Sequence, residues 1–186
     1  MGNKQCNKLS IELDDARIKD ISNRTGLTKE QLYLMHKDFI KDCPNGKLTR
    51  RMFTKFYSQF YPIGNSKSFC KICFMAYDKD KNGYIDFYEY AFVMGVILNG
   101  DIEDKLKLAF DIYDYNDDGH IEKREAEKIF YSIFEMYGDS LPEKTIKNEV
   151  ERLMKKFDTD NNGIITEKEF IDGCLRDQEL REIFAI

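Results

Sequence analysis

Apolar residues recur at helical spacing on both sides of three short acidic stretches. The segments FCKICFMAY, LKLAFDIY and VERLMKKF precede these stretches and have apolar residues at helical intervals. After the stretches, Phe87, Tyr90 and Met94 recur at i, i+3 and i+7, and Ala126 and Ile129 recur at i and i+3. The pattern predicts a helix on either side of each acidic stretch, so that each unit is a helix, a loop and a helix.

The acidic stretches share one template. They are DKDKNGYIDFYE (78–89), DYNDDGHIEKRE (114–125) and DTDNNGIITEKE (158–169), and each matches D-x-[DN]-x-[DN]-G-x5-E without exception. This template is typical of the EF-hand loop, which surrounds a calcium ion with oxygen atoms. A chance match is rare, and all three have helical flanks, so ordinary solvated surface charge is the weaker explanation.

Calcium is a hard cation that takes about six to eight oxygen ligands. The loops offer side-chain oxygens at positions 1, 3, 5, 9 and 12 and a backbone carbonyl at position 7, with position 9 acting through a water molecule. Magnesium is an alternative ion for some of these sites. The predicted ligands are Asp78, Asp80, Asn82, Tyr84, Asp86 and Glu89; then Asp114, Asn116, Asp118, His120, Glu122 and Glu125; then Asp158, Asp160, Asn162, Ile164, Thr166 and Glu169.

The segment KDCPNGKLTRRM, which begins at Lys41, resembles such a loop without most of its ligands. With Gly46 aligned at position 6, Lys41 places a cation and Met52 an apolar group where carboxylates belong. Cys43 offers a soft thiol to a hard ion, and Pro44 fixes φ and lacks a backbone N–H. We therefore expect no calcium in this loop. Residual Mg²⁺ binding or a redox role of Cys43 are the alternatives.

The four units are expected to pair in chain order. Leu48, at position 8 of the first loop, could form a β bridge with the isoleucine at position 8 of the second, so that the first loop braces its neighbour. Gly100 suits a helix end and Asp101 a helix N-cap, which separates the two pairs. The expected fold is all-α, with two pairs of EF-hands, short β bridges between paired loops, and domains at residues 1–99 and 100–186.

Composition narrows the possible functions. The net charge of −5 argues against a nucleic-acid partner. The five cysteines are an odd number without a preceding signal peptide, so free thiols in a reducing compartment are expected.

Cys70 and Cys73 fall on a helix expected to face the core, which favours buried thiols over a zinc or redox site. His36 and His120 are too few and too far apart for a metal site. No nucleophile–base arrangement appears, so we expect no enzymatic activity. The longest apolar run, AFVMGVIL, is far short of the ~20 residues of a membrane span.

A family resemblance follows from particular segments. A leading MGNK, the degenerate DCPNG loop and three intact loops resemble the neuronal calcium sensor family, the frequenin and recoverin group. LTKEQLYLMHKDFIKDCPNG is the most specific segment, and IEDKLKLAFDIYD is the next. The resemblance implies two EF-hand pairs in one molecule, N-myristoylation, and calcium-dependent docking to target proteins or membranes. Two departures are Met35, where the family usually has tryptophan, and a short tail ending at Ile186, which weakens any role for the tail in covering a target groove.

The N-terminus MGNKQC bears on membrane binding. Gly2 is the acceptor position for N-myristoylation, although Cys6 stands where serine or threonine is preferred. Together with the resemblance, this predicts a myristoyl group on Gly2 and a cytoplasmic protein at the membrane periphery. One such chain gives only marginal binding. Lys4 and Lys8 could add attraction to anionic lipid or be ordinary solvated charge, and Cys6 could carry a palmitoyl group.

Aromatic residues gather in the first pair. The chain has 25 phenylalanines and tyrosines, and 15 of them lie between Tyr33 and Phe92. Such residues usually form a core, but this excess also fits a groove for an amphipathic helix of a target protein. The resemblance implies a groove formed by Met35, Phe39, Phe53, Phe56, Tyr57, Phe74, Phe87, Tyr90 and Met94.

These features together predict a calcium sensor that fills three loops, rotates their outgoing helices and exposes the groove. A calcium buffer is one alternative, but buffers barely open on binding and fit an aromatic-rich first pair poorly. A regulatory subunit similar to the calcineurin B chain is another, and DCPNG in the first loop argues against it.

Overall fold

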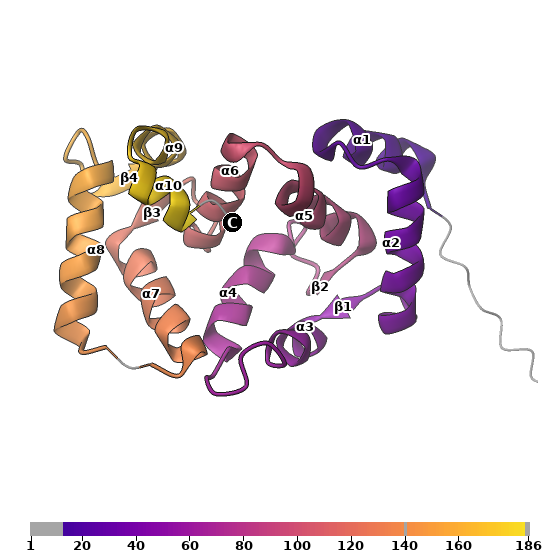
Figure 1. The fold of residues 1–186 in the computed structure, drawn as a ribbon, viewed down its shortest axis with the longest axis horizontal. Coiled ribbons are helices and arrows are strands. Elements are labelled where there is room, and N and C mark those ends of the chain that lie inside the picture. The colour runs from indigo at the N-terminus through magenta and orange to yellow at the C-terminus, as the bar shows by residue number, and fades with distance from the viewer. Residues whose placement is uncertain (1–12, 140, 185–186) are drawn as a thin grey trace, which may run out of the picture.

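The computed structural model describes residues 13–139 and 141–184, which form ten helices and four short strands (Figure 1). This confirms the expected all-α fold with short β bridges. The predicted lipidation site Gly2, with Lys4, Cys6 and Lys8, lies outside the described residues. The elements are α1 Asp15–Thr25, α2 Lys29–Asp42, β1 Leu48–Thr49, α3 Arg50–Tyr57, α4 Lys67–Tyr77, β2 Tyr84–Ile85, α5 Phe87–Asn99, α6 Ile102–Tyr113, β3 His120–Glu122, α7 Lys123–Tyr137, α8 Glu143–Phe157, β4 Ile164–Thr166, α9 Glu167–Arg176 and α10 Gln178–Phe184.

The helices group into four helix–loop–helix units, namely α2–α3, α4–α5, α6–α7 and α8–α9, with α1 before them and α10 after them. In Figure 1 α1, α2, α3 and α5 lie on the right of the molecule and α7 to α10 on the left, with α4 and α6 between them. No helix among the described residues is both long and apolar enough to cross a membrane.

Polar caps set several helix ends where the sequence predicted them. Asp101 N-caps α6, because its carboxylate accepts the backbone N–H of Asp104 at 2.9 Å. Gly100 ends α5, and its N–H donates to the carbonyl of Val96 at 2.9 Å. The break between α5 and α6 therefore falls at Gly100 and Asp101.

The loops pair through antiparallel bridges, as predicted. In the first pair, Leu48 of β1 lies opposite Ile85 of β2. In the second pair, Ile121 of β3 lies opposite Ile165 of β4. The three isoleucines are buried, and Leu48 is half-buried. The apolar residue at position 8 thus ties each loop to its partner and to the core beneath, including the loop that lacks calcium ligands.

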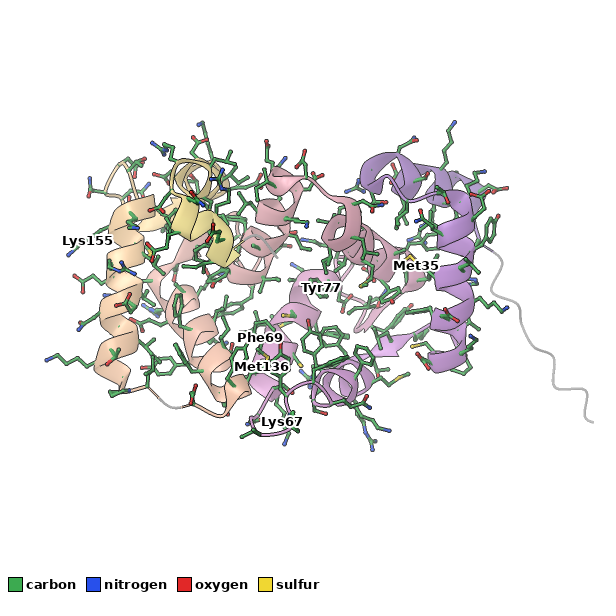
Figure 2. All side chains as sticks on the ribbon, in the orientation of Figure 1. Met35, Lys67, Phe69, Tyr77, Met136 and Lys155 are labelled. Atoms are coloured by element: carbon green, nitrogen blue, oxygen red, sulfur yellow. The ribbon has the colours of Figure 1, made fainter. Side chains whose placement is uncertain are left out.

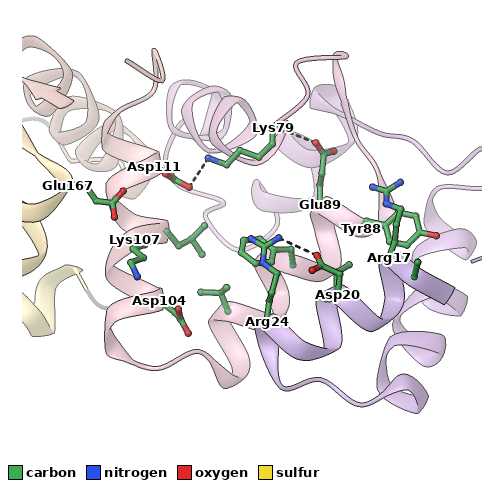
Figure 3. A pocket seen from close by; sticks show the side chains of 15 residues that line it. Arg17, Asp20, Arg24, Lys79, Tyr88, Glu89, Asp104, Lys107, Asp111 and Glu167 are labelled. Carbon is green, nitrogen blue, oxygen red and sulfur yellow. Dashed lines mark hydrogen bonds and ion pairs between the residues drawn. The ribbon is translucent and has the colours of Figure 1, made fainter. Parts of the chain in front are cut away.

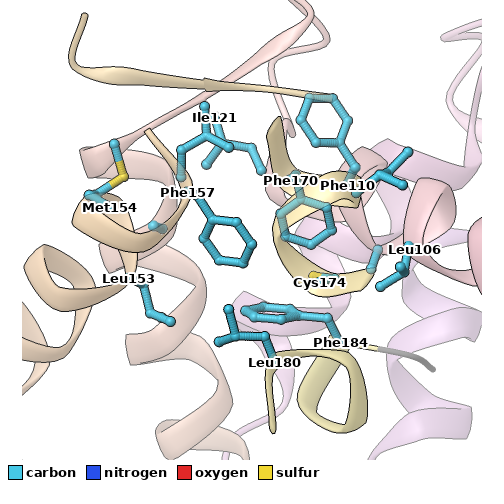
Figure 4. Close-up of a cluster of buried hydrophobic side chains, with 14 of the residues drawn as sticks. Leu106, Phe110, Ile121, Leu153, Met154, Phe157, Phe170, Cys174, Leu180 and Phe184 are labelled. Carbon is cyan, nitrogen blue, oxygen red and sulfur yellow. The ribbon is translucent and has the colours of Figure 1, made fainter. Parts of the chain in front are cut away.

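The core of the second pair is rich in phenylalanine (Figure 4). The rings of Phe157 and Phe170 stack with centroids 5.2 Å apart. Phe184 of α10 lies 5.2 Å from Phe170, and Leu180 of the same helix is also buried. The C-terminal helix is therefore part of the second pair's own core.

A separate buried cluster joins the two pairs. It includes Ile72 and Phe74 of α4 together with Leu108 of α6 and Ile129 of α7. The segment before α4 also rests on the end of α7, where a side chain at Gly64 would collide with the backbone carbonyl of Met136. The two pairs thus share buried surface across the helix break between them.

Candidate calcium centres

The three complete loops have the same backbone shape. Their position-6 glycines have φ of 87° or 88°, in the left-handed region where a side chain would be strained. The residues at position 4 are also left-handed, with φ between 56° and 62°; they are Lys81, Asp117 and Asn161. These turns point backbone N–H groups toward the inside of each loop, where they hold the carboxylates.

The aspartate at position 1 is fixed by two such N–H groups. Asp78 accepts from Asn82 at 3.1 Å through one oxygen and from Gly83 at 2.9 Å through the other. Asp114 has equivalent bonds of 3.0 and 2.8 Å, and Asp158 has bonds of 3.1 and 2.9 Å. Each carboxylate is therefore oriented before any ion arrives.

The remaining predicted ligands come from fixed places in each unit. In the second loop the carboxylates of Asp78, Asp80 and Glu89 converge with their oxygens within 4.8 Å of one another, and Asp158, Asp160 and Glu169 do so in the fourth. The position-5 side chains accept the N–H of position 7; they are Asn82, Asp118 and Asn162. The position-7 residues begin the strands; they are Tyr84, His120 and Ile164. The position-9 residues N-cap the outgoing helices; they are Asp86, Glu122 and Thr166. In the third loop, the position-3 amide of Asn116 accepts the N–H of Asp118 at 3.0 Å.

The glutamate at position 12 shows whether the loops fit calcium. One oxygen of each accepts the N–H of the position-9 residue, at 2.9 to 3.0 Å. The second oxygen of Glu89 accepts the N–H of Lys79, and that of Glu169 the N–H of Thr159, both at 2.9 Å. The second oxygen of Glu125 is buried and has no hydrogen-bond partner among the described residues. A buried carboxylate oxygen without a partner is costly. A calcium ion bound by both oxygens of Glu125 would satisfy it, so this donor set fits calcium.

Local environment shifts the pKa of these glutamates in opposite directions. Burial raises the pKa of Glu125 and of Glu89, since it disfavours the charged form. The backbone N–H of Thr166 is the main group that lowers the pKa of Glu169, to about 2. The charges of Glu89 and Glu125 are thus less well satisfied by the protein itself than that of Glu169.

The cysteine of the first loop, Cys43, points into the core. Cys43 is 2% exposed and lies in a buried cluster with Phe39 and Phe87. Burial raises the pKa of its thiol, which disfavours the reactive thiolate and argues against a redox role. Lys41 forms an ion pair with Asp38 on its own helix. The side chains of Lys41 and Cys43 thus already have other partners. That this loop binds no calcium remains a prediction.

An arginine of α1 contacts the second loop, which the sequence patterns did not predict. Arg17 forms an ion pair with Asp86, the position-9 residue, at 3.2 Å. Its guanidinium also lies 3.6 Å from the centre of the Tyr88 ring. The Tyr88 hydroxyl in turn accepts the backbone N–H of Asp14 at 2.6 Å. The start of α1 is therefore fastened to the loop and to the first turn of α5.

Most of the predicted groove residues belong to two buried clusters, and Phe56 and Met94 belong to neither. Phe39, Phe53, Phe74 and Phe87 are at most 8% exposed, whereas Phe56 is 57% exposed. The others are half-buried; they are Met35, Tyr57, Tyr90 and Met94. Met35 lies on the side of α2 that faces α5 (Figure 2). In this conformation most of the predicted groove is packed as core, and its role in partner binding remains a prediction.

The other candidate groups take structural roles. Cys70 and Cys73 are buried, as expected, and burial raises the pKa of both thiols. His36 packs edge-on against Phe87 with ring centroids 4.7 Å apart. Neither histidine belongs to a cluster of metal-ligating side chains within the described part of the chain.

Two pairs of helix–loop–helix units with bridged loops and oxygen-rich turns define an EF-hand calcium-binding protein. The family models agree: an EF-hand domain pair matches residues 103–175 and an EF hand matches residues 71–94. Human recoverin is 32% identical over 186 residues, covering 97% of this chain and 91% of recoverin. The chain belongs to the neuronal calcium sensor family of EF-hand proteins, of which recoverin is a member. The protein is therefore a calcium sensor.

Proposed function

We propose that the chain binds calcium at its second, third and fourth loops and carries that signal to a target protein at a membrane surface. The observation that carries this proposal is the matching geometry of the three loops. In each, two N–H groups orient the position-1 aspartate, and a position-12 glutamate reaches the same interior. One oxygen of Glu125 is buried and has no hydrogen-bond partner in the described part of the chain, and a bound cation would satisfy it.

The position-12 glutamates would link ion binding to movement. A bound calcium ion supplies two positive charges that attract both oxygens of each glutamate. Glu89, Glu125 and Glu169 lie in the first turns of α5, α7 and α9. Each glutamate that turns further into its loop carries its helix with it. In the second unit, Glu89 would exchange its bond to the Lys79 N–H for the ion.

Movement of α5 would open the first pair. Phe87 and Tyr90 of this helix pack against Phe39 of α2, with ring centroids 5.8 and 5.3 Å apart. Separating these rings would expose apolar area in the first pair, where Phe56 of α3 is already exposed. We propose that this area receives the apolar face of a target helix. The role is a non-enzymatic one.

The membrane part of the proposal rests on the N-terminal sequence. A myristoyl group on Gly2 would give marginal affinity for a bilayer, and Lys4 and Lys8 would add attraction to anionic lipid. The protein would then be cytoplasmic and bound to the membrane periphery. These residues precede α1, which is fastened to the second loop through Arg17.

The test compares calcium-loaded and calcium-free protein, myristoylated and as the Gly2→Ala variant. We expect calcium to raise the fluorescence of an apolar dye in both proteins, and to raise partition onto anionic liposomes only in the myristoylated one. Equal dye binding with and without calcium would instead indicate a buffer. Co-purification of a stoichiometric catalytic protein in the presence of chelator would favour a permanently bound regulatory subunit.

A further inference from the structure

Two lysines of the second loop reach across the boundary between the EF-hand pairs. The ammonium of Lys79 lies 2.7 Å from a carboxylate oxygen of Asp111 on α6, a contact drawn in Figure 3. The ammonium of Lys81 lies 2.8 Å from a carboxylate oxygen of Asp117. Asp111 is in the last turn of α6, just before the third loop, and Asp117 is at position 4 within it. The second and third loops, which belong to different pairs, are thus joined by two ion pairs.

The backbone makes Lys81 an unexpected residue for its position. Position 4 is left-handed in all three loops, and asparagine and aspartate tolerate that region best among residues other than glycine. The third and fourth loops use Asp117 and Asn161 there. Local conformation alone would favour the same choice in the second loop. The partner that Lys81 finds in the third loop gives the lysine a physical reason, and its hydrogen bond lowers the pKa of Asp117.

The exposure of these pairs decides what they can do. The side chains of Lys81 and Asp117 are 63% and 56% exposed, and those of Lys79 and Asp111 are 50% and 34% exposed. Exposed pairs contribute little to folding. The two ammonium groups also lie beside the third loop, which is proposed to bind a divalent cation, and they repel such a cation over several ångströms. Their main effect is therefore expected on ion binding.

A charged cleft of about 940 Å³ lies beside one of these pairs (Figure 3). It runs between α1, α5 and α6, and both Lys79 and Asp111 line it. An open cleft admits water and salt, so the two loops interact through a screened medium with a range of about 8 Å at physiological ionic strength. The effect of the lysine charges on the third loop should fade as salt is added.

We propose that Lys79 and Lys81 of the second loop lower the affinity of the third loop for calcium, by holding positive charge against it. This inference rests on the proposed calcium binding at the third loop. The two lysines act on the third site from outside its own unit.

The first test isolates the third site. Glu89→Gln and Glu169→Gln together disable the second and fourth loops, and calorimetry then measures calcium binding at the third. Adding Lys81→Gln should raise that affinity about twofold to fivefold at low salt, and much less at 1 M KCl. The matched control is Lys67→Gln, the same charge change at the far end of α4, where Lys67 forms no ion pair among the described residues (Figure 2). Equal effects of the two variants would overturn the proposal.

The second test needs no calcium. In chelator, Lys81→Asp and Asp117→Lys each place like charges opposite one another, while the double variant restores an opposite pair. Aspartate suits the left-handed backbone of position 81, so the swap adds little strain there. We expect the unfolding equilibrium constant of the double variant to recover about twofold to fivefold over the sum of the single effects. Strict additivity would show that the pair does not form.

The two tests separate the possible failures. If the isolated third loop bound no calcium at all, calcium binding at that loop and the effect of the lysines on it would both be wrong, while the charge swap would still report on the ion pair. If calcium bound normally but Lys81→Gln behaved as Lys67→Gln does, only the effect of the lysines would be wrong.

Discussion

The first and second loops face each other in one bridge yet have kept different parts of the same template. Both have a position-6 glycine with positive φ, 71° at Gly46 and 88° at Gly83. Both contribute the apolar position-8 residue that forms the bridge. They differ at position 4, where Pro44 cannot adopt the left-handed turn that Lys81 makes. Without that turn we expect the first loop not to wrap an ion.

This difference shows that two tasks of an EF-hand loop depend on separate residues. The turn glycine and the position-8 residue hold the pair together through backbone pairing and apolar burial. The oxygens at positions 1, 3 and 12 are the predicted ligands of the ion, and in the first loop Lys41, Cys43 and Met52 stand in their place. A loop can therefore lose the ion and remain a brace for its partner.

Loss of the bridge should have the largest effect. Ile85 is 1% exposed, so we expect Ile85→Ala to lower the free energy of unfolding in chelator by about 2–5 kcal/mol. Leu48 is half-buried, and Leu48→Ala should cost roughly half as much. Urea denaturation measures both. A larger loss from Leu48→Ala would contradict the burial seen on the two sides of the bridge.

Loss of the position-12 carboxylate should come next. Glu89→Gln removes a charged bidentate ligand, and we expect at least about a tenfold loss of calcium affinity at the second loop, equivalent to about 1.4 kcal/mol. Met52→Gln introduces the same residue at position 12 of the first loop, where there is no carboxylate to lose, and should leave calcium binding unchanged. Calorimetry on both variants checks this, and a loss of affinity in Met52→Gln would mean that the first loop contributes to a site.

Loss of the contact from α1 should have a smaller effect. Arg17 is 51% exposed and Asp86 25% exposed, so their ion pair is screened by solvent. We expect Arg17→Gln to lower the free energy of unfolding by about 0.2–1 kcal/mol, toward the lower end in salt. Arg51→Gln is the control, because Arg51 is exposed and forms no ion pair in the described part of the chain. Thermal unfolding in chelator should distinguish the two; identical midpoints would remove any role for Arg17.

Restoring only two ligands to the first loop should have no measurable effect. Lys41→Asp with Met52→Glu supplies carboxylates at positions 1 and 12, but Pro44 still blocks the position-4 turn and Cys43 stays in the core. We predict no additional calcium equivalent in equilibrium dialysis. Adding Pro44→Asn would test the backbone reason separately. Tight binding by the double variant alone would show that the proline is not the obstacle.

The sequence was sufficient for the features that depend on short-range spacing. The helix–loop–helix units, the bridge from Leu48 to Ile85 and the caps around Asp101 follow from residues only a few positions apart or from a repeated template. The ligand residues follow from the same template. In the second and fourth loops three of the predicted carboxylates converge, and their role as ligands stays a prediction.

Features that depend on tertiary packing were not predictable in the same way. Arg17 meets Asp86 only because α1 packs on α5, 69 residues further along the chain. Lys81 looks like ordinary surface charge until the third loop is placed beside it. Aromatic residues at helical spacing are the same pattern whether they line a core or a groove, which is why the packing of Phe39 and Phe53 could not be read from the sequence.

The most direct test of three filled loops and one brace is an NMR titration of the position-6 glycines with calcium. The N–H groups of Gly83, Gly119 and Gly163 donate to their position-1 aspartates at 2.8 to 2.9 Å, so their amide resonances should move when those carboxylates bind an ion. The Gly46 N–H instead donates to the carbonyl of Cys43 at 2.8 Å. We predict that three glycine resonances shift and saturate while that of Gly46 stays in place. Saturable movement of Gly46 comparable with the others, or no movement of the other three, would contradict it.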